Sequence, residues 1–335
     1  MKMNEDVKSQ VSLQGVLEAR RLISHHLNPT PLSHYPLVSR WLGCEAYIKH
    51  ENHNPTGSFK IRGGLNLMGN LTREERERGV ITATRGNHGQ SIALASRIHG
   101  VRCLIAVPEG NNPEKNEAMK SFGAELLVHG RDFDEAREKV EEICLSERLR
   151  YIHSANEPLL IEGVGTYALE IVEELPDLDY VFVPIGGGSG VCGLLTVIRK
   201  LLSSVRIVGV QAESASAVYQ SWKAGRPVTT ESADTFADGL ATRTTFELTF
   251  QLIQEQIDQV ITVSEEELEE TVYELLKRTH NIAEGAGAAA TAGAYKMRAE
   301  IAGKKVVTIL SGSNLETTRL KAILNYFDQP GLATP

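Results

Sequence analysis

The sequence contains few cysteines, and they are scattered along the chain. Only four occur among its 335 residues, and no two of them form a Cys-x-x-Cys pair. Isolated thiols of this kind are typical of small buried side chains in a reducing compartment, and they do not suit a disulfide framework or a zinc site. We therefore expect free thiols and a cytoplasmic protein.

Signals for membranes and for nucleic acids are also missing. The first ten residues, Met1 to Gln10, are polar and charged, without the apolar core of a signal peptide. No stretch is apolar for long enough to span a bilayer. The net charge of −8 provides no basic surface for a polyanion. We expect neither a membrane nor a nucleic acid as a partner.

The composition is that of an ordinary globular protein, with 41% hydrophobic and 23% charged residues. Short β-rich runs alternate with longer helical patterns. The expected strands are Glu45–His50, Val80–Thr84, Cys103–Val107, Glu125–His129, Tyr180–Ile185, Arg206–Gln211 and Lys305–Leu310. The expected helices are Phe59–Gly69, Gln90–His99, Glu114–Phe122, Phe133–Ser146, Ile161–Glu174, Val191–Leu202, Glu265–Thr279, Gly287–Glu300 and Leu315–Tyr326. This alternation is typical of parallel sheets covered by helices on both faces. One open sheet would accommodate these strands, but 335 residues fit two α/β lobes better.

A glycine-rich segment follows one of the expected strands and precedes a helix. It consists of Gly186, Gly187, Gly188, Ser189 and Gly190. Such a turn offers free backbone N–H groups and the positive end of a helix dipole, so it can hold a phosphate. Ligands of open α/β sheets collect beyond the carboxyl ends of the strands, where this segment lies.

The same segment also matches the pattern of an NAD-dependent oxidoreductase. Gly188, Gly190 and Gly193 form a Gly-x-Gly-x-x-Gly motif, and Glu213 follows about 20 residues later, where an acid binds a ribose hydroxyl. The segment alone does not distinguish a dinucleotide from a single phosphate.

A lysine after a tight turn is the second candidate for chemistry. Residues Pro55 to Gly57 predict a turn, and Ser58 is placed to cap a helix with Lys60 in its first turn. The positive end of the helix dipole should lower the pKa of the Lys60 amine. A lowered pKa suits an amine that attacks an aldehyde and later moves a proton.

The stretch from Lys49 to Gly64 closely resembles the cofactor-lysine motif of the threonine/serine dehydratases. These are fold-type II enzymes (the tryptophan synthase β group) that depend on pyridoxal 5′-phosphate (PLP). Further segments resemble family motifs in the same order: Thr84–Gln90, Gly186–Gly190, Ala237–Ala241, Glu284–Gly287 and Ser311–Asn314. Several motifs in the order of the family are much more specific than the glycine pattern alone, so the resemblance outweighs the oxidoreductase interpretation.

The resemblance implies a role for each of these residues. Lys60 would bind PLP through its amine and later take the Cα proton of the substrate. Phe59 would flank the cofactor ring, Asn87 would hydrogen-bond its hydroxyl, and the segment from Gly186 to Gly190 would hold its phosphate. The remaining expected cofactor contacts are Gly239, Glu284 and Ser311. The expected substrate contacts are Ser58, Thr84, Arg85, Gly86 and His88.

Ser311 also implies the type of reaction. By resemblance it faces the pyridine nitrogen, where a neutral hydroxyl cannot stabilise a pyridinium charge. This favours loss of a β-substituent over transamination or decarboxylation. We therefore expect a hydroxy-amino acid dehydratase (ammonia-lyase) that converts L-threonine, L-serine or a related 3-hydroxy amino acid to a 2-oxo acid and ammonia. A β-replacement enzyme or an amino acid racemase of the same fold is the alternative.

Arg85 is the main departure from the relatives. Serine racemases resemble this chain but have a serine acid/base at the matching position, and arginine cannot lose its proton at ordinary pH. A racemase is therefore disfavoured. Arg85 could bind the second carboxylate of 3-hydroxyaspartate or stack on the ring of 3-phenylserine, and it could equally turn outward and pair with an acid of the other lobe.

The remaining expectations concern metals, domains and assembly. Some relatives bind a metal through acids after the strand that ends here at Gln211, but only Glu213 is acidic in that segment, so we expect no metal. A small domain, residues 53–150, is expected as an insertion in a large domain made of residues 1–52 and 151–335. The resemblance further implies a homodimer acting on a small-molecule amino acid.

Overall fold

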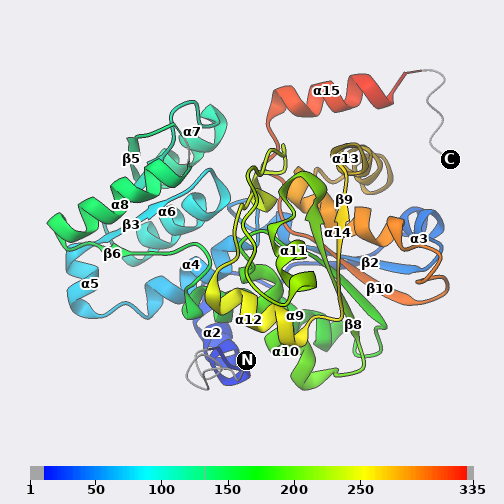
Figure 1. Cartoon of the computed structure of the whole chain (residues 1–335). Coiled ribbons are helices and arrows are strands. Elements are labelled where there is room, and N and C mark those ends of the chain that lie inside the picture. The colour runs from blue at the N-terminus through cyan, green and yellow to red at the C-terminus, as the bar shows by residue number, and fades with distance from the viewer. Residues whose placement is uncertain (1–10, 132, 330–335) are drawn as a thin grey trace.

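The structure is a computed structural model that describes residues 11–131 and 133–329. The polar stretch Met1–Gln10, examined above for a signal peptide, lies outside these ranges. The described strands form two separate sheets, one on each side of the molecule in Figure 1. The expected two α/β lobes are therefore confirmed, and the alternative of one open sheet is wrong.

The larger sheet has six strands in the order β1, β2, β10, β7, β8, β9. Their bounds are Leu32–His34 (β1), Glu45–His50 (β2), Lys305–Leu310 (β10), Tyr180–Pro184 (β7), Arg206–Ala212 (β8) and Gln259–Val263 (β9). All neighbours are parallel except β1 and β2, which form an antiparallel pair. The carboxyl ends of the parallel strands therefore meet at one edge.

The smaller sheet has four parallel strands in the order β5, β4, β3, β6. Their bounds are Glu125–Val128 (β5), Cys103–Val107 (β4), Val80–Ala83 (β3) and Arg150–Tyr151 (β6). This sheet takes its strands from residues 80–151, whereas the larger sheet takes its strands from residues 32–50 and 180–310. The division of the chain into domains at residues 53 and 150 stays a prediction.

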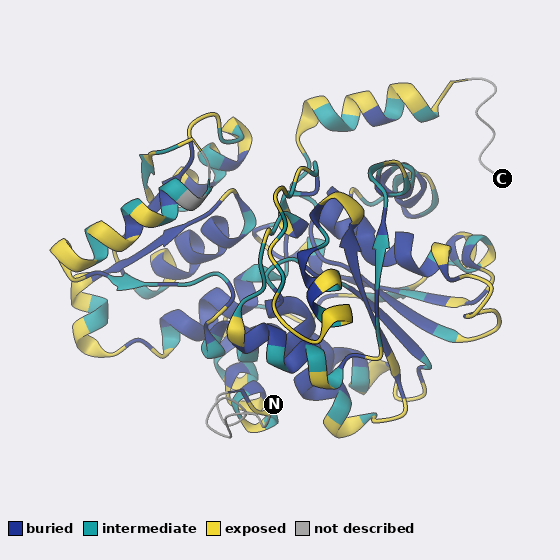
Figure 2. Cartoon of the chain, in the orientation of Figure 1, coloured by how far each residue is buried: buried dark blue, intermediate teal, exposed yellow. Residues whose placement is uncertain are grey.

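Helices cover both faces of the sheets, and the buried residues concentrate between these layers (Figure 2). The helices are Leu13–Ile23 (α2), Pro36–Leu42 (α3), Lys60–Gly69 (α4), Arg73–Arg78 (α5), Asn87–His99 (α6), Pro113–Ser121 (α7), Phe133–Glu147 (α8), Pro158–Glu174 (α9), Ser189–Leu201 (α10), Ala217–Ala224 (α11), Glu247–Gln256 (α12), Glu265–Thr279 (α13), Gly285–Lys296 (α14) and Thr317–Phe327 (α15). Strand β7 shows why its sequence is continuously apolar. Val181 and Val183 belong to the hydrophobic cluster that includes α9 and α10, while Phe182 belongs to the cluster on the opposite face that includes α14.

Several helices and strands were not expected from the sequence. The two-residue β6 and the three-residue β1 are too short to show a pattern, and β9 lies at the edge of the larger sheet, where three of its five residues are partly exposed. Helix α2 did carry a signal, because the Ser12 side chain caps it and its buried residues Val16, Ala19 and Ile23 share one face. None of the helices within the described ranges has the length and hydrophobicity needed to span a membrane.

Candidate active site

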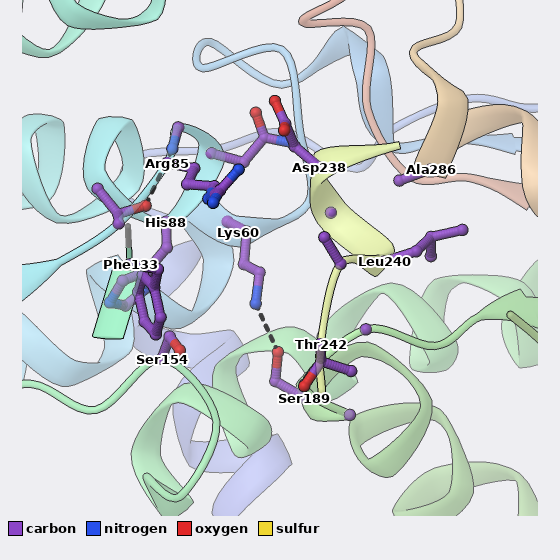
Figure 3. A pocket seen from close by; sticks show the side chains of 18 of the residues that line it. Lys60, Arg85, His88, Phe133, Ser154, Ser189, Asp238, Leu240, Thr242 and Ala286 are labelled. Carbon is purple, nitrogen blue, oxygen red and sulfur yellow. Dashed lines mark hydrogen bonds between the residues drawn. The ribbon is translucent and has the colours of Figure 1, made fainter. Parts of the chain in front are cut away.

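A cavity of about 540 Å³ lies where the carboxyl ends of β3, β7 and β10 meet. Fifteen of its lining residues were expected from the sequence, and they come from segments far apart in the chain. Every predicted site residue lines it except Ser58: Phe59, Lys60, Thr84, Arg85, Gly86, Asn87, His88, Gly186, Gly187, Gly188, Ser189, Gly190, Gly239, Glu284 and Ser311. Figure 3 shows Lys60 between Arg85 and His88 on one side and Leu240 and Thr242 on the other. The volume is in the range of small-molecule sites.

Lys60 is the first residue of α4, and its amine points into the cavity. Its Nζ donates a hydrogen bond to Ser189 Oγ at 2.8 Å, which links α4 to the glycine-rich segment (Figure 3). Burial lowers the pKa of Lys60 to about 8. The predicted direction of this shift is confirmed, but its cause is loss of solvent rather than the helix dipole.

The predicted capping role of Ser58 is wrong. Phe59 is the N-cap residue of α4, and no side chain caps it. Ser58 instead pairs with Gly312 in an antiparallel β-bridge, and its buried Oγ has no hydrogen-bond partner within the described residues. The backbone N–H of Phe59 donates to Ser311 O at 3.1 Å. Contacts with the segment after β10 therefore fix the start of α4, and they override the local capping preference.

The glycine-rich segment is built to accept a phosphate. The backbone N–H groups of residues 186–190 donate to no acceptor within the described part of the chain, and helix α10 begins at Ser189. Gly188 has a φ of +101°, which favours glycine. A Cβ at Gly186 would lie 1.9 Å from the carbonyl oxygen of Gly239. Only glycine therefore fits at position 186.

Gly193, which completed the dinucleotide pattern, has a structural role. A Cβ there would lie 2.7 Å from the backbone nitrogen of Gly165, because α9 and α10 pack closely at this point. The missing side chain of Gly193 allows the two helices to pack and does not serve a ligand. The oxidoreductase interpretation therefore loses one of the residues on which it depended.

A polar network lines the wall around Asn87. Asn314 Nδ2 donates to Asn87 Oδ1 at 2.7 Å, and Asn87 Nδ2 donates to Glu284 Oε1 at 2.5 Å. Burial raises the pKa of Glu284. The second N–H of the Asn87 amide remains available for a ligand. Ser311 is buried in the same wall, and its hydroxyl donates to Ala286 O at 3.2 Å.

Hydrogen bonds of Thr84 and His88 hold the turn after β3 in place. Thr84 Oγ1 accepts the backbone N–H of Gly86 at 3.0 Å and that of Gly89 at 3.3 Å, which makes the turn rigid. His88 Nε2 lies 3.0 Å from Thr82 Oγ1, so its ring supports the sheet beneath the cavity. Burial lowers the pKa of His88 to about 3, and the charge of Lys60 contributes.

Arg85 is exposed and lies between the main cavity and a neighbouring cavity of about 430 Å³, both of which it lines. Among the described residues, no acid forms an ion pair with it. The interpretation that Arg85 pairs with an acid of the other lobe therefore has no support.

Several lining residues were missed from the sequence. Lys115 of α7 forms an ion pair with Asp238, at 2.5 Å, and so joins the lobe of the smaller sheet to the segment between β8 and β9 of the larger sheet. A Cβ at Gly86 would lie 2.6 Å from Lys115 Cδ, so this glycine makes room for the lysine. An aromatic wall was also missed: Phe133, Tyr151, His153 and Phe246. Such contacts join segments that are far apart in the sequence, and no local pattern indicates them.

A buried ionic cluster holds α4 from behind. Arg62 donates to Glu51 Oε2 at 2.7 Å and to Glu170 Oε1 at 2.6 Å, and Lys49 Nζ lies 2.6 Å from Glu170 Oε2. Burial would raise the pKa of Glu51, but the charge and hydrogen bonds of Arg62 hold it below its ordinary value. The cluster thus connects α4 to β2 and α9, two residues after Lys60.

Comparison with known proteins identifies the family. The family model described as pyridoxal-phosphate dependent enzyme matches residues 23–312. The chain belongs to the PLP-dependent enzymes. The predicted family and cofactor are therefore confirmed.

Similar proteins within this PLP-dependent family include two curated relatives. An L-threonine ammonia-lyase of Thermotoga maritima is 36% identical over 94% of this chain and 78% of the relative. The catabolic L-threonine dehydratase TdcB of Escherichia coli K12 is 33% identical over 95% of this chain and 97% of the relative. The processed form of threonine deaminase isoform 2 from Solanum lycopersicum superposes with a TM-score of 0.90 at 32% identity, covering 97% of this chain and 94% of that one. This agreement confirms the predicted fold type.

The cavity fits PLP. Three groups could supply partners for its aldehyde, phosphate and ring hydroxyl. They are the Lys60 amine with its lowered pKa, the backbone N–H groups of residues 186–190, which have no described acceptor, and the amide of Asn87. Within the described residues, no cluster of histidine, cysteine and carboxylate side chains could hold a metal ion.

Proposed function

We propose that this protein is a dehydratase (ammonia-lyase) that removes water from L-threonine and L-serine and releases a 2-oxo acid and ammonia. The position of the Lys60 amine carries the proposal. It lies in the cavity, it contacts the glycine-rich segment through Ser189, and its pKa, lowered to about 8, leaves a fraction of the amine neutral and able to accept a proton near neutral pH.

PLP, when bound, withdraws the electron pair that is left when the substrate loses its Cα proton. Lys60 takes that proton. The N–H groups of Gly186 to Gly190 would hold the phosphate, Asn87 would hydrogen-bond the ring hydroxyl, and Phe59 would flank the ring. Gly239 closes on Gly186 from the other side and keeps the phosphate site narrow.

The turn after β3 binds the substrate carboxylate in this proposal. Because Thr84 Oγ1 occupies the N–H of Gly86, the next N–H groups, those of Asn87 and His88, are left at the start of α6 without a described acceptor. The N-terminus of a helix favours an anion. Ser58 lies outside the cavity lining, so its expected contact with the substrate is indirect.

The neutral hydroxyl of Ser311 favours elimination over reactions that need a protonated pyridine nitrogen. Arg85 cannot act as the second base of a racemase, because its guanidinium keeps its proton. We assign Arg85 to the choice of side chain instead. Its charge at the cavity rim, which no described acid pairs with, favours a substrate with a second carboxylate, 3-hydroxyaspartate, or with an aromatic ring, 3-phenylserine.

The test is release of 2-oxo acid from a panel of L-threonine, L-serine, 3-hydroxyaspartate and 3-phenylserine. Product from at least one of them, abolished in Lys60→Ala, is expected. Cofactor absorbance without product from any of them would overturn the proposal in favour of β-replacement or of no turnover. In Arg85→Ala the ratio of kcat/KM between substrates should change, and an unchanged ratio would refute its role in specificity.

We further propose that the protein acts as a cytoplasmic homodimer. The family resemblance implies the dimer, and the free cysteines are typical of a reducing compartment. Sedimentation equilibrium of the purified holoenzyme tests the dimer, and a monomer mass near 37 kDa would refute it.

A further inference from the structure

Thr249 lies directly behind the glycine-rich segment, and no motif in the sequence indicates it. It is the third residue of α12, and its side chain is buried. Its Oγ1 donates a hydrogen bond to the carbonyl oxygen of Gly187 at 2.9 Å. A Cβ at Gly188 would lie 2.6 Å from Thr249 Cβ, so the backbone of the segment rests on this side chain. Thr249 therefore contacts two of the five residues proposed to hold the phosphate.

The hydroxyl of Thr249 has one proton and two carbonyl oxygens within reach. Gly187 O lies 2.9 Å from Oγ1, whereas Phe246 O, three residues earlier in the chain, lies 3.3 Å away. The shorter contact gives the stronger hydrogen bond. No other group in the described part of the chain donates to Gly187 O. The direction of this carbonyl therefore depends on Thr249.

The direction of the carbonyl in turn fixes an N–H group on the other side of the segment. Gly187 O and the N–H of Gly188 belong to one peptide group, and in a trans peptide they point in opposite directions. The described residues contain no cis peptide bond. Gly187 and Gly188 line the cavity, whereas Thr249 does not. Because the carbonyl points toward Thr249, behind the segment, the N–H of Gly188 points toward the cavity.

Helix α12 is itself fixed, so the hydroxyl has a defined position. Leu248 and Ile253 belong to the same hydrophobic cluster as Leu194 of α10, the helix that begins within the glycine-rich segment. Protein interiors are closely packed, so α12 cannot shift relative to α10 without disturbing this core. The carbonyl of Gly187 thus has a donor whose place is set by the packing of two helices.

Backbone N–H groups bind an anion more tightly when they already converge on it before it arrives. Glycine has more backbone freedom than any other residue, and losing that freedom on binding costs affinity. We propose that Thr249 is a positioning residue for the cofactor phosphate. Its hydroxyl holds the peptide between Gly187 and Gly188 with the N–H toward the phosphate. This inference rests on the proposed function, which places the phosphate on residues 186–190.

Two ligands that differ only in the phosphate test this assignment. PLP and pyridoxal share the ring, its hydroxyl and the aldehyde, but pyridoxal carries a hydroxyl group in place of the phosphate. Titration of the full-length apoprotein, followed by cofactor absorbance, gives a Kd for each. Thr249→Val removes the hydroxyl and keeps the branched Cβ against Gly188, whereas Thr249→Ser keeps the hydroxyl. Thr196→Val is the matched control, because this buried threonine of α10 also donates to a backbone carbonyl, that of Cys192 at 2.8 Å.

Thr249→Val should raise the Kd for PLP about 10-fold, the usual share of one neutral hydrogen bond. Its Kd for pyridoxal should change less than about twofold, because pyridoxal has no phosphate to accept the N–H of Gly188. Thr249→Ser should bind PLP within about threefold of wild type, because it keeps the donor. Thr196→Val should change neither Kd by more than about twofold, because its hydrogen bond lies within α10.

An equal rise in both Kd values would make Thr249 a structural residue only. An unchanged Kd for PLP would show that the carbonyl keeps its direction without the hydroxyl. Either result overturns the assignment. Failure of its premise looks different: if Gly186→Ala also left the Kd for PLP unchanged, the phosphate would lie away from the glycine-rich segment. Failure of the dehydratase proposal would appear separately, as the absence of 2-oxo acid release, because these titrations do not depend on turnover.

Discussion

Replacing Arg62 by methionine should destabilise the protein by about 3–5 kcal/mol, the usual cost of removing one partner from a buried ion pair. Arg62 is only 1% exposed and contacts both Glu51 and Glu170, which are themselves buried. The cluster is neutral as it stands, with two cations and two carboxylates. Without Arg62, only Lys49 remains to balance two negative charges in the interior.

Urea unfolding of the holoenzyme at pH 7, followed by far-UV circular dichroism, measures this loss. A second substitution should restore part of it: Glu51→Gln in the Arg62→Met background removes one of the two stranded charges. Arg20→Met is the matched control, because Arg20 pairs with Glu173 at the surface, with 41% and 52% of the two side chains exposed. An exposed pair contributes at most about 1 kcal/mol. If Arg62→Met cost no more than Arg20→Met, the cluster would not stabilise α4 as argued.

Three further changes have predicted outcomes. Gly186→Ala should weaken PLP binding at least about 10-fold in an equilibrium titration of apoprotein, because its Cβ would collide with Gly239 O; wild-type affinity would contradict the close approach. The folded pKa of His88, about 3, lies below the ordinary value of about 6.5, so its contribution to stability should be present above pH 6.5 and be lost as the pH falls toward 3. The urea midpoint of His88→Gln should therefore fall less between pH 7 and pH 5 than that of wild type, and parallel curves would refute this. Under native conditions a thiol reagent should modify the partly exposed Cys144 before the buried Cys192, because burial raises the pKa of the Cys192 thiol. Labelling of Cys192 before Cys144 would contradict the packing of α10.

Sequence patterns were sufficient to place most of the site. The turn at Thr84, the glycine-rich segment and Ser311 each follow an expected parallel strand, and parallel strands bring their carboxyl ends together. Local patterns mislead where contacts between distant segments determine the structure. Ser58 has the side chain of a helix cap, but its backbone pairs with Gly312, which is remote in the sequence.

The cause of the pKa shift of Lys60 and the far wall of the cavity could not be predicted from the sequence. The lowered pKa of Lys60 depends on burial, and burial is a property of the folded chain rather than of a helix start. His153 and the ion pair of Lys115 with Asp238 occur in segments with no chemical motif of their own. Nothing in their local sequence shows that folding brings them to the same cavity.

The contact between Gly186 and Gly239 limits how this enzyme can be re-engineered. Because the two backbones touch, a substitution at either position would have to be accompanied by movement of the other segment, so the two sites cannot be varied independently in a library. Side chains on the cavity wall, such as Arg85, Phe133 and Phe246, are free of this restriction. A search for new substrates would therefore begin with these three positions and leave both glycines unchanged.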